Sequence, residues 1–73
     1  MLKQFDIVPG PMAWQVMHNQ VAFRACVAKR DAIRVALALG RMQGRLGDEA
    51  EVVLRGAAGE PLARRRFDLT GRH

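Results

Sequence analysis

The sequence predicts a single α+β domain in which a small antiparallel sheet carries one helix on one of its faces. Short segments of alternating apolar and polar residues, bounded by Gly, Pro or Asn, indicate strands on both sides of one helical segment. That helical segment is rich in Ala, Leu and Arg and contains neither Gly nor Pro until Gly40. We expect the order ββ(β)αββ in one domain, residues 1–73, with an ordered core over about residues 4–68 and a frayed tail over residues 69–73.

The first third of the chain predicts a β-hairpin and a third strand. Residues 5–8 alternate, a Pro-Gly-Pro sequence at residues 9–11 interrupts them, and residues 14–18 resume the strand pattern. Residues 20–27 alternate again, which places Val21, Phe23, Ala25 and Val27 on one side of a third strand. The aromatic residues expected to anchor the core are Phe5, Trp14, Phe23 and Phe67.

Residues 28–42 predict the helix, with no good capping residue before it. At about 100° per residue, one broad sector of this helix can lie on a sheet. Gly40 falls in that sector, where its missing side chain allows helix and sheet to approach closely. We expect Gly44 or Gly47 to end the helix. The sector consists of Ala32, Ile33, Ala36, Leu39 and Gly40.

The last third predicts a second hairpin, with strands at residues 51–55 and 62–67 around a turn at residues 56–60. Pro61 has no N–H to donate, so it should begin the last strand or lie on a sheet edge. One helix covers only one face of such a sheet. The open face must therefore be polar or meet a second copy of the chain.

A set of short segments, taken in their order and spacing over about residues 6–67, carries a family resemblance. The segments are Ile7-Val8-Pro9, Trp14-Gln15-Val16, Asp31-Ala32-Ile33 with Ala36, Gln43-Gly44, Val52-Val53 and Gly59. In these segments the chain resembles a family of small bacterial proteins that is classed as a domain of unknown function. It differs from the family at Val27-Ala28, where the family has a polar cap and Thr, and at residues 45–48, which look like an insertion. The resemblance implies a ββαββ fold and a bacterial origin, and it implies no activity.

The amino-acid composition indicates the cellular compartment and the class of binding partner to expect. The lone Cys26 cannot form an internal disulfide, and residues 1–11 contain Asp6 and two prolines without a long apolar run. We therefore expect no signal peptide, no membrane association and a cytoplasmic location. The net charge of +5 and pI near 11.1 favour a nucleic acid or another anionic partner. Because ten of the twelve basic residues are Arg, a GC-rich genome would produce the same charge without selection for such a partner.

Catalytic chemistry has little support, since the chain lacks Ser and Tyr and its single Thr is Thr70. His18 and Cys26 have no spacing that brings them together, and His18 and His73 show no metal-ligand pattern. The glycines form no phosphate-binding loop. We predict that the chain is not an enzyme and has no catalytic, metal, cofactor-binding or small-molecule site, and we interpret the acidic cluster as solvated charge: Asp48, Glu49 and Glu51.

One positive feature is an arginine stripe on the predicted helix, formed by Arg30, Arg34, Arg41 and Arg45. These residues lie within about 60° of one another and span about 22 Å. A second basic cluster, Arg64, Arg65 and Arg66, lies on the last strand. Such a stripe suits the phosphate backbone of a nucleic acid without base specificity. The alternative is that an amphipathic helix turns its charges to water and these charges happen to be arginines.

Core size gives the leading functional interpretation. A chain of this length buries about 60% of its unfolded surface, and its core supplies about 3–5 kcal/mol. With no disulfide or metal to add stability, we expect a homodimer that pairs through its sheet or its edge strands. The predicted function is a non-catalytic, oligomerising interaction module, and the alternative is sequence-nonspecific nucleic-acid binding through the arginine stripe.

Overall fold

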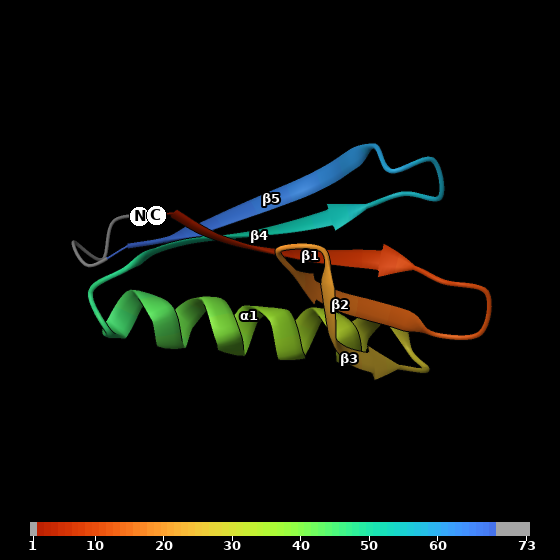
Figure 1. The fold of residues 1–73 in the computed structure, drawn as a ribbon, viewed down its shortest axis with the longest axis horizontal. Helices are drawn as coiled ribbons and strands as arrows, with labels where there is room; N and C mark the ends of the chain where they lie inside the picture. Colours follow the sequence, from red (N-terminus) through yellow and green to blue (C-terminus); the bar gives the residue numbers. More distant parts are fainter. Residues whose placement is uncertain (1, 69–73) are drawn as a thin grey trace.

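The structure, a computed structural model, describes residues 2–68 and contains one helix and five strands in that range (Figure 1). The predicted frayed tail, residues 69–73, lies outside the described residues. In chain order the elements are β1 (Leu2–Pro9), β2 (Trp14–His18), β3 (Val21–Cys26), α1 (Lys29–Arg45), β4 (Glu49–Arg55) and β5 (Pro61–Phe67). The α+β class is thus confirmed, and three strands precede the helix.

The sheet is mixed, so the prediction of an antiparallel sheet is wrong. Its strands lie in the order β3-β2-β1-β4-β5, and β1 pairs with β4 in parallel while the other three pairs are antiparallel. The cause is the third strand. Because β1, β2 and β3 reverse direction twice, α1 runs back along the sheet and β4 starts at the same end as β1 (Figure 1).

The core lies between α1 and the sheet face that the helix covers. Phe5, Ile7 and Val16 point to this face and are buried, and Phe67 at the end of β5 is 6% exposed. Trp14 packs against the cluster but is only partly buried. The remaining core residues are Ala32, Ala36, Ala50 and Val52.

Phe23 does not anchor the core, contrary to the prediction, and is 59% exposed. The register of β2 and β3 shifts between Val16 and Met17, so that Val16 pairs with Arg24 and Met17 pairs with Ala22. Phe23 is the extra residue of this bulge. The bulge breaks the alternation that placed Val21, Phe23, Ala25 and Val27 on one side of the strand.

Glycines shape α1 as the sequence indicates. A Cβ at Gly40 would lie 2.9 Å from Cδ2 of Phe67 and 3.0 Å from Cγ2 of Val52, which confirms the close approach of helix and sheet. The helix starts after Ala28 without a side-chain cap. At its other end Gly47 has a φ of +92°, and the Asp48 N–H donates to the Gln43 carbonyl oxygen at 3.0 Å. Gly47 therefore ends the helix in a Schellman motif.

Candidate interaction surfaces

The predicted arginine stripe lies on the exposed side of α1. All four of its residues are exposed, and none of them forms an ion pair with another described residue. The acidic residue on α1 is Asp31, in the first turn. The structure therefore brings these arginines together on one helix face without neutralising them: Arg30, Arg34, Arg41 and Arg45.

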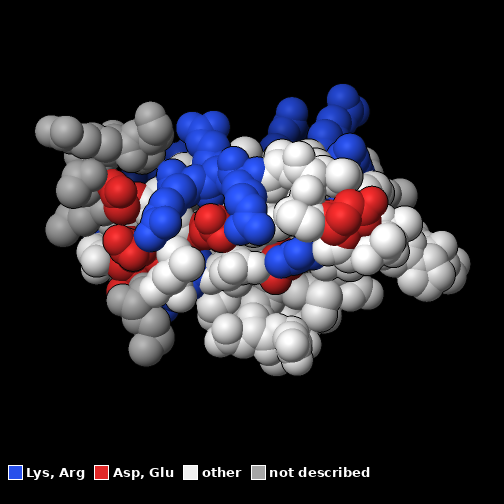
Figure 2. Space-filling view, turned by 90° about the horizontal axis from the view of Figure 1, so that it is seen from above, with Lys and Arg blue, Asp and Glu red and all other residues white. Residues whose placement is uncertain are grey.

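The sheet face that the helix leaves open carries paired charges over β1, β4 and β5, whereas over β2 and β3 it carries Met17, Ala22 and Ala25. Arg55 Nε donates to Asp6 Oδ1 at 3.0 Å, and Arg64 Nη1 donates to Glu51 Oε1 at 3.1 Å. Val53 lies between Asp6 and Arg64 in the register and is fully buried, so its polar neighbours cover it. On the side away from the helix, Asp and Glu side chains lie among those of Lys and Arg (Figure 2).

The second basic cluster is divided between the two sheet faces, because successive strand residues point to opposite sides. Arg64 and Arg66 lie on the open face, where Arg66 Nη2 is 3.1 Å from Glu49 Oε2. Arg65 lies on the helix side, with its guanidinium carbon 5.4 Å from the centre of the Phe67 ring. The sequence-predicted group of three thus contributes one arginine to the side of the molecule that carries α1.

The two edge strands differ in character. In the part of the chain that the structure describes, no strand pairs with the outer side of β3 or of β5. The β3 edge carries the exposed apolar side chains of Val21, at 64%, and Phe23, at 59%, whereas β5 begins with Pro61 and carries three consecutive arginines. Proline and charge protect a sheet edge from pairing with a like edge. The β3 edge has a bulge but neither proline nor a run of charges.

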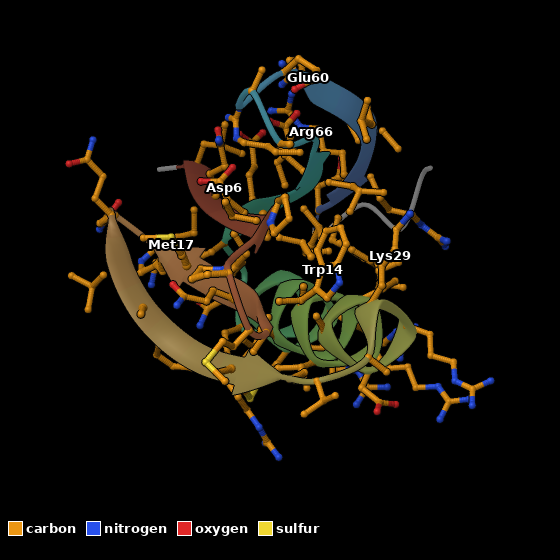
Figure 3. All side chains as sticks on the ribbon, turned by 90° about the vertical axis from the view of Figure 1, so that its right-hand side faces the viewer. Asp6, Trp14, Met17, Lys29, Glu60 and Arg66 are labelled. Atoms are coloured by element: carbon orange, nitrogen blue, oxygen red, sulfur yellow. The ribbon has the colours of Figure 1, made fainter. Side chains whose placement is uncertain are left out.

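An apolar groove of about 240 Å³ lies between α1 and the β5 side of the sheet. No sequence pattern predicts this groove, because it arises where β4 and β5 diverge from α1 (Figure 1). In the view of Figure 3, Trp14 and Lys29 project between α1 and β5, and Lys29 Nζ is 5.6 Å from the Trp14 ring centre. The residues lining the groove are Ile7, Ile33, Leu37, Val52, Leu54, Ala63, Arg64 and Arg65.

The titratable groups that a catalytic site would need lie apart. His18 and Cys26 are at opposite ends of the β2–β3 ladder, about 13 Å along the strands. The His18 ring stacks on Phe5 at 4.8 Å, and its Nδ1 lies 3.0 Å from the Gln4 carbonyl oxygen. Since a carbonyl accepts, Nδ1 carries the hydrogen. Within residues 2–68, no three His, Cys, Asp or Glu side chains gather where a metal ion could bind.

The side chains of the acidic cluster form ion pairs with basic side chains of the sheet. Asp48 Oδ2 lies 3.3 Å from Lys3 Nζ, and the two glutamates, Glu49 and Glu51, pair with arginines of β5. These pairs are partly or largely exposed, so each contributes about 0–1 kcal/mol. Their clearer effect is on the distribution of charge, because they neutralise Lys3, Arg64 and Arg66 of the sheet and leave the helix positive.

Comparison with protein-family models, with curated proteins and with solved structures finds no match to this chain. Among the described residues, no helix has the length and apolar character needed to cross a bilayer.

Proposed function

We propose that this chain is a non-catalytic interaction module that forms a homodimer through the outer edge of β3. The observation that carries the proposal is an exposed edge strand with apolar side chains at Val21 and Phe23. Pairing two such edges satisfies their backbone N–H and C=O groups and buries both side chains. The small core of the domain provides a reason for a second copy to add stability.

The β3 edge fits a like partner better than the β5 edge does. Two copies of β5 would oppose Arg64, Arg65 and Arg66 with the same residues, and like charges across strands are unfavourable. Two copies of β3 would oppose mainly apolar residues, with Arg24 the one charged side chain of that strand. A two-fold axis perpendicular to the sheet would pair the strands antiparallel and keep both helices on one face.

Paired lysine variants test this proposal, because Ala25 on β3 and Ala63 on β5 are both exposed alanines of edge strands. In sedimentation velocity we expect the unmodified chain and Ala63→Lys to have about twice the 8.1 kDa mass of one chain. Ala25→Lys should sediment as a monomer. A monomeric unmodified chain at tens of micromolar, or a dimer unaffected by Ala25→Lys, would overturn the proposal.

Nucleic-acid binding through α1 is the second candidate function. The observation that favours it is the segregation of charge: the four exposed arginines of α1 form no ion pair with any residue in the range 2–68, while the open sheet face pairs its arginines with acids. A row of cations spanning about 22 Å can contact several successive phosphates. Arg64 and Arg66 point to the other side of the molecule, so Arg65 is the β5 residue best placed to assist.

The resemblance to the small bacterial family remains a proposal. It is supported by the position of the matching segments, which fall in β1, β2, α1, β4 and the turn before β5. The bacterial origin and the cytoplasmic location likewise stay predictions from the sequence.

A further inference from the structure

We propose that the groove between α1 and β5 binds an extended segment of a partner protein in which apolar and acidic residues alternate. The segment would add to the outer edge of β5 as a sixth strand. This site is separate from the β3 edge and takes a partner of different chemistry.

The size of the groove indicates the kind of group it accepts. Its volume of about 240 Å³ is smaller than the roughly 300–1,000 Å³ of pockets that enclose a drug-sized molecule. The helix side of the groove is formed by Ile33 and Leu37 and the sheet side by Leu54 and Ala63. One or two apolar side chains fit such a space better than a whole small molecule does.

The β5 edge supplies the rest of an extended-peptide site. Leu62, Ala63, Arg64 and Arg65 are all exposed, and two of the lining residues, Ala63 and Arg65, point toward the helix side. A strand laid along this edge would exchange backbone hydrogen bonds with β5 and direct every second side chain toward α1. Backbone hydrogen bonds with β5 and apolar contacts with α1 would together give this shallow groove its affinity for the segment.

The positive charge of the β5 edge favours an acidic partner. Arg65 lines the groove on the helix side, where Arg41 lies about 40° from Leu37 around the helix axis, on the side away from the core. When the apolar residues of the segment point toward α1, its alternating carboxylates point to the open sheet face, beside the guanidinium groups of Arg64 and Arg66, which also pair with Glu51 and Glu49. A second copy of β5 would bring three more arginines instead, so the basic edge excludes self-pairing and favours an acidic strand.

A titration of the full chain with a capped octapeptide of alternating leucine and glutamate tests the proposal. We expect amide chemical shifts to change along β5 and at Ile33 and Leu37, with β3 unaffected. A peptide in which lysine replaces glutamate keeps the apolar residues and should not bind. A third peptide with proline at its centre should bind at least about tenfold more weakly, because it lacks a donor for the strand ladder.

Two glutamate variants locate the site. Ala63→Glu places a negative charge in the groove and should weaken binding of the leucine–glutamate peptide at least about tenfold. Ala25→Glu makes the same change on β3 and should leave the affinity unchanged. The proposal is overturned if the peptide causes no shifts, if the shifts map to β3, if Ala63→Glu binds as well as the unmodified chain, or if a duplex oligonucleotide and not the peptide shifts the groove residues.

Discussion

Small residues on the sheet-facing side of α1 set the distance between the helix and the sheet. Ala32, Ala36, Gly40 and Gly44 recur every fourth residue and are all buried. The Phe67 ring and Val52 already occupy the space that a side chain at Gly40 would need. A protein interior is close-packed, so even one added carbon there must move the ring or separate the two layers.

Substitution of Gly40 by Ala tests this contact. Ala gains about 1 kcal/mol of helix propensity over Gly, whereas overpacking a core costs about 1–3 kcal/mol. A Cβ at Gly40 would lie 2.9 Å from the Phe67 ring, but one at Gly44 would lie 3.3 Å from Phe67 Cβ. In urea unfolding we expect Gly40→Ala to lower the free energy of unfolding by up to about 2 kcal/mol and Gly44→Ala to change it less or raise it. The close-approach account is wrong if Gly40→Ala is the more stable of the two variants.

At the scale of the element, the exposed face of α1 predicts a specific salt dependence for nucleic-acid binding. Each phosphate that the protein neutralises contributes about −0.9 to the slope of log affinity against log salt on duplex DNA. Changing Arg34 and Arg41 together to Gln should flatten this slope by about two. Both side chains are exposed, so the fold should be retained. Gel-shift assays over a range of salt measure the slope.

Two arginines of the open sheet face provide the matched control for this double variant. Arg64 and Arg66 are paired with Glu51 and Glu49, and their loss removes the same formal charge. If α1 is the binding face, the Arg64→Gln and Arg66→Gln double variant should keep most of the slope. Equal effects of the two double variants would contradict a helix-specific site. Absence of any shift with DNA or RNA at about 50 mM salt would end the nucleic-acid proposal.

The sequence predicted most elements because local patterns determine them, and it failed where long-range pairing determines the outcome. The Gly-Pro turns and alternating segments located the strands, and the helical wheel placed Arg34 and Arg41 on the exposed side of α1. The parallel pairing of β1 with β4 was missed, since it depends on how many strands precede the helix. The bulge at Phe23 was also missed, because no local signal distinguishes it from a regular strand.

The same contrast between local patterns and long-range pairing applies to the candidate surfaces. The period of two along a strand separates Arg65 from its two neighbours, so the sequence already contained the information that the cluster is split. The groove that Ala63 lines had no such signal, because it forms only where a twisted sheet leaves the helix. Residues at an edge are therefore the least predictable part of this fold.

At the scale of the whole molecule, the mixed sheet gives the domain two unlike edges on opposite sides of one helix-covered core (Figure 1). A copy paired at β3 would leave the α1–β5 groove of each protomer at the far end of the extended sheet. The homodimer and the binding of an acidic segment to the α1–β5 groove are thus compatible, and each can be tested while the other is intact. The account depends most on β3, because the function we propose requires that edge to pair with its own copy.

An isotope-filtered nuclear Overhauser experiment on a mixture of labelled and unlabelled chains tests that claim most directly. We predict cross-peaks between copies among the side chains of β3, including Val21, Ala25 and the neighbouring Phe23, and none that involve Ala63 on β5. Cross-peaks between copies that map to β5 or to the open sheet face would contradict the proposed interface, as would a sample with no such cross-peaks and a mass of 8.1 kDa.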